Sequence, residues 1–379
     1  MKKLYGISKV IFPLLIIGLI IYLFYAQPFG HRPIKFGSTY MTMNNDFYQT
    51  LNEPIANEID DHNDILYSRN PELSVNNQVN EINNFIKNEV KVIFINPVDG
   101  TSTKLIRALK KAHEAGIKII VVDSQLENSS NYVDCTIRSN NYQAGVLCAK
   151  ELMSKQKSAN ILILQQPTAI SVVDRIKGFE DTIKNNKNFH IVDKINTTGQ
   201  SENSYPKVQK YLKQGKNFDT IMSLNDKTAV GALAAINANN KSSKIAIYSI
   251  DGSENIKKML STQNANVKAT VAQSPLQIGK VAIKVAYELI NHQKVKKKSF
   301  YLLNLLRLRI LRILTSRGGN NEIQILSIYA PLHGNFKFYY YLFYRCTIFI
   351  NHAIYPKPPI KFRTLNYASS RSSFAHDFI

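Results

Sequence analysis

From Ile34 onward, runs of apolar residues alternate with segments in which apolar residues recur at helical spacing. Runs such as KVIFIN (91–96) and ANILILQ (159–165) are almost continuously apolar, which is typical of parallel strands covered on both faces. Between such runs, the segment 74–89 has one apolar stripe at helical spacing, with Ser74 as a candidate N-cap. The expected strands are 34–40, 64–69, 91–96, 117–123, 132–137, 159–165, 189–195, 218–224, 244–250 and 267–273.

This alternation predicts an α/β protein. Repeated βαβ units imply parallel sheets with right-handed crossovers. Ten strands would make an unusually large open sheet, so we predict two sheets in two lobes.

Polar and aromatic residues follow many of the expected strands at the point where each strand ends. In doubly wound α/β proteins, ligands bind beyond the carboxyl ends of the strands, so we expect these residues to meet in one cleft. Amides, carboxylates, a guanidinium and aromatic faces suit a neutral polyhydroxyl ligand better than they suit catalysis. The residues are Asn45, Phe47, Tyr48, Asp123, Arg175, Asn225, Asp226, Asp251 and Gln273.

The N-terminal segment predicts a membrane anchor. No charged residue occurs between Val10 and His31, and about 20 apolar residues are enough to span a bilayer. Lys2, Lys3 and Lys9 precede this stretch, which places the N-terminus inside and the rest of the chain outside the cytoplasm. A cleaved signal peptide is the alternative, although it requires small residues near the cleavage point.

Composition argues against several other classes of protein. The net charge of +21 is concentrated near the two ends of the chain, so nucleic-acid binding is not expected. There is no Gly-rich phosphate loop, HExxH or GxSxG motif, and the eight histidines have no metal-ligand spacing, so we expect no enzyme, no cofactor and no metal. Cys135 and Cys148 are either one disulfide, if the helix after 132–137 runs back along that strand, or two buried thiols.

Several motifs resemble, in order and spacing, the periplasmic sugar-binding proteins of ABC importers (type I, ribose-binding group). They cover residues 34–295 and comprise GSTYMTMNNDFYQTL, INPVD, IIVVDS, DRIKGFEDTI, LNDKTAVGALAAI, SIDGSENIK and ATVAQSPLQIG. The resemblance implies two Rossmann-like lobes that close on a ligand, joined by a three-strand hinge near Ser139-Asn140 and Gln273-Ser274. Together with the N-terminal stretch and the C-terminal composition, it leads us to expect four parts: 1–33 as cytoplasmic start, anchor and linker, 34–138 plus 274–298 as first lobe, 139–273 as second lobe, and 299–379 as a tail.

The resemblance also assigns the ligand contacts. It implies that Phe47 and Tyr48 sandwich a sugar ring and that the other contacts are Ser38, Asn45, Asp123, Arg175, Asn225, Asp251 and Gln273. Asn45 is alternatively a helix N-cap, and Asp226 is expected to cap its helix. The chain departs from the family pattern at Ser124, where an arginine is usual, and at Ser201, where an aromatic residue is usual.

The expected function is that of an extracytoplasmic solute-binding protein, which delivers a sugar-like molecule to the permease of an ABC importer. The alternative is a membrane-anchored sensor of the same fold that presents its ligand to a histidine kinase.

The composition changes abruptly after Lys298. The tail 299–379 has no strand–helix alternation, and it contains FKFYYYLFYRCTIFI (336–350). Read one nucleotide out of frame, Leu302 to Arg317 can encode Val-Lys-Leu-Ile and a stop, which is a typical family ending. We therefore expect a frameshifted, disordered tail and a hinge that lacks its third strand. A second membrane segment at 336–350 is the alternative, but it is short and interrupted by charges.

Overall fold

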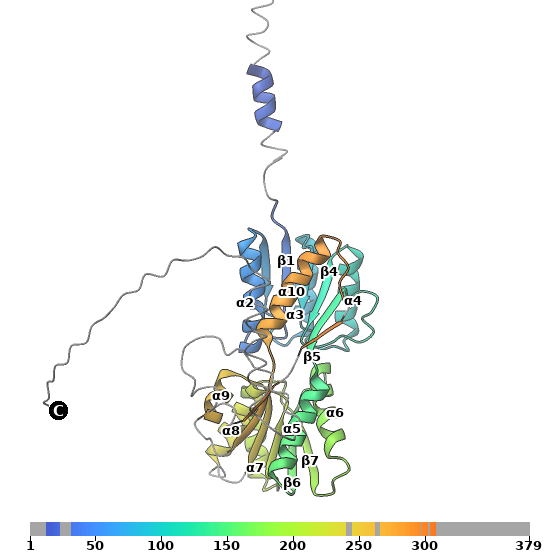
Figure 1. Cartoon of the computed structure of the whole chain (residues 1–379). Helices are drawn as coiled ribbons and strands as arrows, with labels where there is room; N and C mark the ends of the chain where they lie inside the picture. The colour runs from blue at the N-terminus through green and yellow to red at the C-terminus, as the bar shows by residue number, and fades with distance from the viewer. Residues whose placement is uncertain are drawn as a thin grey trace, which may run out of the picture. The chain divides into compact units, whose positions relative to one another are not determined.

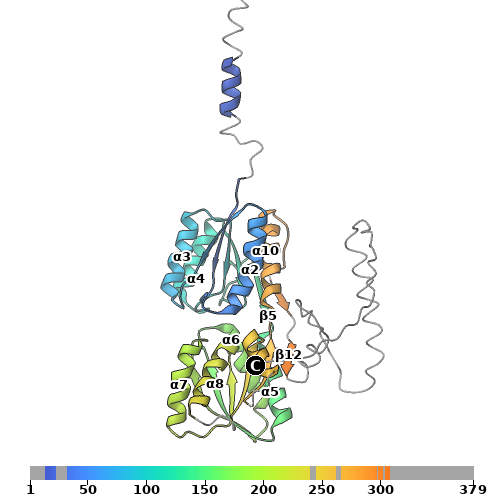
Figure 2. The same cartoon turned by 90° about the vertical axis from the view of Figure 1, so that its left-hand side faces the viewer.

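The structure is a computed structural model, which describes residues 13–22, 32–239, 245–261 and 266–296 together with the backbone of 298–301 and 304–307. Within this part the strands form two six-stranded sheets, as the alternating pattern predicts. Each sheet lies between helices on both faces (Figures 1 and 2). All ten expected strands are present, and two further short strands follow them.

The first half of the molecule is the sheet with strand order β11-β5-β4-β3-β1-β2, in which all strands are parallel. Its helices α2 and α10 pack together on one face, and α3 and α4 on the other (Figure 2). The strands are β1 (Lys35–Thr39), β2 (Ile65–Arg69), β3 (Val92–Ile95), β4 (Lys118–Val122), β5 (Cys135–Ser139) and β11 (Lys298–Tyr301). The helices are α2 (Asp46–Asp61), α3 (Val75–Lys87), α4 (Thr103–Glu114) and α10 (Pro275–Ile290).

The second half is the sheet with strand order β12-β10-β9-β8-β6-β7, which is parallel except for β12. Helices α5 and α6 pack together, and so do α7 and α8. The strands are β6 (Ala159–Gln165), β7 (Phe189–Asn196), β8 (Thr220–Ser223), β9 (Ala246–Asp251), β10 (Val267–Ala272) and β12 (Asn304–Arg307). The helices are α5 (Asn141–Lys155), α6 (Ile170–Ile183), α7 (Ser201–Lys213), α8 (Asp226–Ala238) and α9 (Glu254–Ser261).

Side-chain caps fix the starts of several helices. Ser74 accepts a hydrogen bond from the Asn77 N–H at the start of α3, which confirms the expected N-cap. Asn45 and Asn225 cap α2 and α8 in the same way, and both helices start directly after a strand-end loop. These caps therefore hold the loops at the carboxyl ends of the strands in fixed positions.

The chain passes between the two sheets at the positions where the hinge was expected. It leaves β5 after Ser139 to enter α5, and it leaves β10 after Ala272 to enter α10. A third passage follows, because 298–301 pair with β5 while 304–307 pair with β10. The expectation that the third strand is missing is therefore wrong for this backbone, and residues 308–379 lie outside the described residues.

Cys135 and Cys148 are buried and free, so the buried-thiol alternative is the observed one for this pair. Cys135 Sγ lies 3.2 Å from the Lys296 carbonyl oxygen, and Cys148 Sγ lies 3.3 Å from that of Ser249. The expectation that these residues approach each other is wrong for a topological reason. Helix α5 does not return along β5 but crosses to the second sheet.

Residues 13–22 of the expected anchor are helical and their side chains are exposed. Of the helices that the structure describes, none has the length and apolar character needed to cross a bilayer. Residues 10–12 and 23–26 of the expected span lie outside the described residues.

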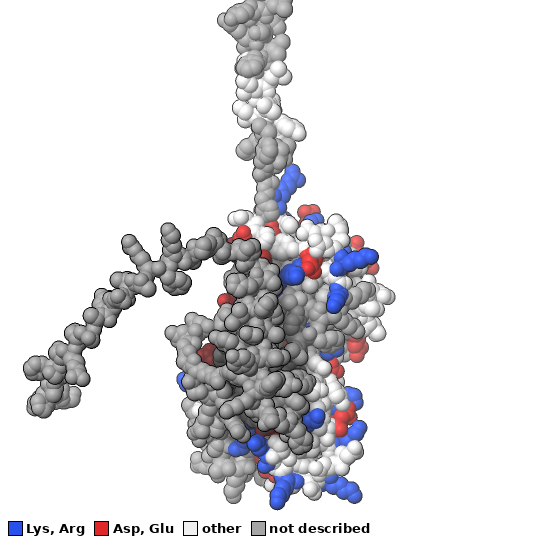
Figure 3. Space-filling model, in the orientation of Figure 1, with Lys and Arg blue, Asp and Glu red and all other residues white. Residues whose placement is uncertain are grey.

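Charged side chains of both signs lie among one another on the described surface that Figure 3 shows. A nucleic-acid interface would be a stripe of Lys and Arg on one face. The view in Figure 3 offers no such stripe among the described residues.

Candidate ligand-binding site

A cavity lies between the two halves, where the carboxyl ends of both sheets meet. It contains about 410 Å³ of empty space, part of which is open to solvent. About 30 Å³ of this space can hold water-sized molecules, so the side chains around the cavity lie close together in this arrangement. Its lining is Met41, Asn45, Phe47, Tyr48, Asp123, Gln166, Ala169, Ser171, Val172, Arg175, Thr198, Gly199, Gln200, Leu224, Asn225, Asp251 and Gln273.

The aromatic residues of the lining, Phe47 and Tyr48, both come from the start of α2. Their rings meet edge to face, with centroids 5.4 Å apart and planes at 86°. The Tyr48 ring is buried and stacks on Tyr40 at a centroid distance of 6.0 Å. The half-buried Phe47 is therefore the more exposed ring of this pair, and the expected sandwich of a sugar ring by both side chains stays a prediction.

Asp123 follows β4 and places a buried carboxylate in the cavity. Its φ of +64° is in the left-handed region, which Asp tolerates better than most residues. Its Oδ2 accepts hydrogen bonds from Asn96 Nδ2 at 3.2 Å and from the Tyr48 hydroxyl at 3.4 Å. Its Oδ1 is buried and has no hydrogen-bond partner in the described part of the chain. Burial raises the pKa of Asp123, while the nearby Arg175 guanidinium lowers it.

Asn96 belongs to a buried polar network beneath the first sheet that positions Asp123. Besides Asp123, its amide donates to the Val122 carbonyl at 3.0 Å. The main-chain carbonyl of Asn96 accepts from Gln78 Nε2 at 2.9 Å, and Gln78 Oε1 accepts from the Val98 N–H at 2.9 Å. These bonds fix the turn after β4, and with it the direction of the Asp123 carboxylate.

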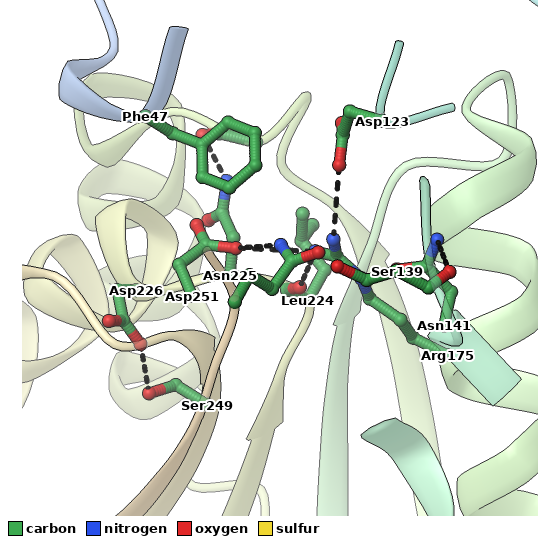
Figure 4. Close-up of polar contacts among 12 residues, drawn as sticks. Phe47, Asp123, Ser139, Asn141, Arg175, Leu224, Asn225, Asp226, Ser249 and Asp251 are labelled. Atoms are coloured by element: carbon green, nitrogen blue, oxygen red, sulfur yellow. Dashed lines mark hydrogen bonds and ion pairs between the residues drawn. The ribbon is translucent and has the colours of Figure 1, made fainter. Parts of the chain in front are cut away.

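Arg175 on α6 supplies the cationic group of the cavity (Figure 4). Its Nε donates to Asn141 Oδ1 at 2.8 Å, and its Nη1 donates to the Leu224 carbonyl at 2.9 Å. Its guanidinium also lies 3.8 Å from Asp123 Oδ1 and 3.6 Å from Asp251 Oδ1. The guanidinium is thus held by the second half and faces a carboxylate from each half.

Two glycines let α5 approach α6 closely enough for Asn141 to reach Arg175. A Cβ on Gly145 would lie 1.8 Å from the Arg175 carbonyl oxygen, and one on Gly178 would lie 2.0 Å from that of Tyr142. The bare backbone at these positions therefore sets the spacing of the two helices.

Helix α8 is capped by Asn225 and not, as expected, by Asp226. Asn225 Oδ1 caps α8 through the Thr228 N–H at 2.8 Å, and its Nδ2 donates to the Gly199 carbonyl at 3.1 Å. Asp226 does not cap the helix, because Asn225 occupies that position. Its buried carboxylate accepts from Ser249, from the Ser253 N–H and from Thr270, and so ties α8 to β9 and β10.

Asp251 ends β9 with a φ of +134°, another conformation that L-residues rarely adopt. Strained residues of this kind cluster at ligand sites. Gln273 Nε2 donates to Asp251 Oδ1 at 2.8 Å, so the residue at the second passage between the sheets holds this carboxylate. Burial, opposed by Arg175 and reinforced by Asp226 and Asp123, raises the pKa of Asp251 to about 8.

Eight of the nine expected contacts line the cavity, and Ser38 is the exception. Ser38 lies buried in β1, where its hydroxyl bonds to Ser68 at 3.0 Å. It precedes the end of its strand, so its side chain packs within the first half instead of reaching the cavity.

The lining also contains polar residues that the sequence analysis did not select. Gln166 follows β6, and Thr198, Gly199 and Gln200 follow β7. The strand-end rule that found Asp123 and Asn225 applies equally to these two strands, so it could have found these residues.

Ser124, which stands where the resembling family has an arginine, does not line the cavity but bonds to the second half. Its hydroxyl accepts from the Ser171 N–H at 3.2 Å, near the start of α6, whose N-cap residue Ala169 provides no side-chain cap. A side chain of the first half thus supplies an acceptor for an N–H group at the start of a helix in the second half. Nearby, the Gly100 N–H donates to the Thr168 carbonyl at 3.1 Å.

The chemistry of the site is that of recognition. The lining contains no histidine and no cysteine. In the part of the chain that the structure describes, no group of His, Cys, Asp and Glu is arranged to hold a metal ion. What remains are carboxylates, amides, one guanidinium and one aromatic face, which hold hydroxyl groups and one apolar face of a ligand. A cavity with such a lining between two sheets is typical of a protein that binds a solute.

Comparison with known proteins gives the family. Residues 36–294 match the model of the periplasmic binding protein domain family, and the chain belongs to that family. Proteins of this family bind solutes and are not enzymes.

Two relatives illustrate the similarity. The chain is 25% identical over 268 residues to the ribose import binding protein of Bacillus subtilis (strain 168), covering 70% of this chain and 85% of that protein. It is 30% identical over 213 residues to a galactofuranose-binding protein of Escherichia coli (strain K12), covering 54% of this chain and 65% of that protein.

Solved structures show the same fold. An ABC transporter solute binding protein from Agrobacterium vitis with bound D-fucose is 24% identical, with a TM-score of 0.68, and the match covers 73% of this chain and 96% of that one. One from Mycobacterium smegmatis with bound glycerol is 21% identical, with a TM-score of 0.69, covering 75% and 97%. The type I periplasmic binding protein fold inferred from the sequence is thereby confirmed.

Proposed function

We propose that this protein captures a sugar-like small molecule between its two halves and delivers it to the permease of an ABC importer. The observation that carries the proposal is the cavity, in which carboxylates from both halves face one guanidinium and an aromatic ring. Charge-assisted hydrogen bonds to hydroxyl groups are stronger than neutral ones, and an aromatic face suits the C–H side of a sugar ring. The names of the relatives support the same class of ligand.

The two halves act as lobes in this proposal. We place the first lobe at 34–138 plus 274–298 and the second at 139–273, with the passages after Ser139 and Ala272 as hinge strands. Ligand contacts from both lobes favour the closed arrangement, which is the form that a permease can distinguish from the empty protein.

A thermal-shift screen over monosaccharides, polyols and furanosyl compounds tests the proposal. A ligand at 100 times its Kd stabilises the folded protein by about 2.7 kcal/mol, so a true ligand raises the Tm. Asp123→Asn should remove most of the shift, whereas Asp61→Asn, at an exposed position of α2, should retain it. If no compound raises the Tm, or if both variants respond like the wild type, the proposal is wrong.

We further propose that residues 10–26 anchor the protein in the cell membrane with the binding part outside the cytoplasm. The uncharged stretch between Val10 and His31, preceded by lysines, supports this. Fractionation of cells that express the full chain tests the anchor. Release of the protein by an alkaline wash would contradict it.

We separately propose that the reading frame is lost after Lys298, because the composition changes abruptly at that point. Resequencing the gene around the codons for 296–299 tests it, and an intact frame in independent isolates would refute it.

A sensor function is not favoured, because the relatives are import proteins. Permease and ATPase genes beside this one would agree with that conclusion.

A further inference from the structure

The charges that line the cavity do not balance. The charged residues of the lining are Asp123, Arg175 and Asp251, so two carboxylates face one guanidinium. Their side chains are 5%, 4% and 11% exposed, so water compensates little of this charge. A third buried carboxylate, Asp226, lies behind them and already accepts from three donors.

The guanidinium is also committed to other partners. Arg175 uses Nε and Nη1 for hydrogen bonds to Asn141 and the Leu224 carbonyl. Its distances to the two carboxylates are 3.8 and 3.6 Å, well beyond the roughly 2.7–2.9 Å of a charge-assisted hydrogen bond. It therefore compensates both carboxylates only in part.

Three buried oxygens of the lining lack a hydrogen bond, and Arg175 Nη2 reaches none of them within hydrogen-bond distance, since it lies 3.8 Å from Asp123 Oδ1. Asp123 Oδ1, Gln200 Oε1 and Gln273 Oε1 are buried and have no hydrogen-bond partner in the described ranges. Donors at the starts of α2, α6 and α8 are already bonded to oxygens of Asn45, Ser124 and Asn225, respectively. Since unsatisfied buried acceptors are costly, a ligand group placed against these three oxygens should be a donor.

A buried carboxylate without full compensation takes a proton or a cation. Asp251 faces Arg175 on α6, Asp226 on α8, Asp123 after β4 and Gln273 after β10, and burial raises its pKa to about 8. In the empty cavity near pH 7 it therefore holds a proton. A positively charged group on the ligand would take the place of that proton.

We propose, on the basis of the function proposed above, that the cavity prefers a polyhydroxyl compound bearing an ammonium group over its counterpart with a hydroxyl group at the same position. An ammonium group offers three donors and no acceptor, which matches both the charge and the unsatisfied oxygens of this lining. The positive ends of the helices that start at the cavity already stabilise part of the negative charge. The expected preference is therefore about tenfold, which corresponds to about 1.4 kcal/mol.

Calorimetric titration with matched pairs tests the proposal. The probes are D-galactosamine with D-galactose, D-glucosamine with D-glucose, and D-mannosamine with D-mannose, at pH 7 in two buffers of different ionisation enthalpy. We expect at least one amine to bind about tenfold more tightly than its neutral partner and to release a proton to the buffer. The neutral partner should release none, because Asp251 then keeps its proton.

Asp251→Asn removes one of the two carboxylates and should reduce the ratio of affinities within that pair to about one. Asp61→Asn is the matched control on the surface and should leave the ratio unchanged. If Asp251→Asn does not fold, the proton count in the wild type still decides.

Two results would overturn the proposal in different ways. If neutral sugars bind in the cavity while every amine binds equally or more weakly, this inference fails and the proposed function stands. If neither the pairs nor the wider panel of sugars and polyols bind, both fail together.

Discussion

The two walls of the cavity use their polar groups differently. On the first wall, Asp123 keeps one carboxylate oxygen without a hydrogen bond, and Phe47 is only half-buried. On the second wall, Arg175 and Asn225 are bonded to the backbone or side chains of their own half. The first wall thus holds an unused carboxylate oxygen, whereas Arg175 and Asn225 of the second wall are already bonded to their own half and the buried Gln200 Oε1 is left without a partner there.

Because of this difference, substitutions on the two walls should affect ligand affinity and fold stability differently. Substitutions on the first wall should weaken binding while leaving the fold nearly intact. Substitutions on the second wall should damage both, because the same side chains bind the ligand and hold α5, α6 and α8 together.

The largest effect is expected for Arg175→Met. It leaves the buried Asp123 carboxylate without a cation and the Asn141 and Leu224 oxygens without their donor, and breaking a buried ion pair in this way costs about 3–5 kcal/mol. Urea denaturation should show this loss of unfolding free energy, together with loss of ligand binding. Arg107→Met, at an exposed position of α4, is the matched control and should change neither. A fully stable Arg175→Met would contradict the framework role of the second wall.

The pH dependence of stability tests the buried carboxyl groups around Arg175. Burial raises the pKa of Asp251 to about 8 in the folded protein, against an ordinary value of 3.8. The unfolded chain therefore binds fewer protons between pH 4 and pH 8, and the unfolding free energy of the ligand-free protein should fall as pH rises through this window. The raised pKa values of Asp123 and Asp226 act in the same direction. Asp251→Asn should flatten the profile of Tm against pH, and an unchanged slope would show that Asp251 does not titrate there.

On the first wall, Asp123→Asn should lower the affinity for the ligand found by screening about 30-fold, because a hydrogen bond to a charged group contributes about 2 kcal/mol. The unfolding free energy should change by less than about 1 kcal/mol, since Asn tolerates the left-handed backbone. Calorimetry and urea denaturation of the same preparation give both values. A large loss of stability without a loss of affinity would reverse the proposed division of roles.

Phe47→Ala should lower the affinity about fivefold, since an aromatic contact is worth about 1 kcal/mol. Tyr48 is less informative, because its ring also packs on Tyr40. An unchanged affinity in Phe47→Ala would remove the aromatic face from the site.

The smallest effect concerns closure. Ser124→Ala removes the hydrogen bond to the Ser171 N–H and should lower affinity about threefold, because a neutral hydrogen bond contributes about 0.5–1.5 kcal/mol. Ser38→Ala, which removes a buried hydroxyl within the first half, should lower stability by a similar amount without changing affinity. Equal affinities in the two variants would show that the Ser124 contact does not favour the closed form.

Much of this arrangement is predictable from the sequence because it depends on strand ends. Apolar runs located all ten expected strands, and residues that directly follow or end them, such as Asp123 and Asp251, reach the lining. The double use of Asn225 as cap and wall residue was not predictable, since residue type does not reveal which partner an amide chooses. Ser38 was misplaced because a resemblance transfers positions but not side-chain directions. Strands β11 and β12 were missed because their pairing is a property of the assembled sheets and not of the local pattern.

A crystal structure of the complex with the ligand found by screening tests the central claim most directly. We predict ligand density between the Phe47 ring and the Arg175 guanidinium, with a ligand donor within hydrogen-bond distance of Asp123 Oδ1. Density at any other place on the molecule, with this cavity occupied only by water, would contradict it.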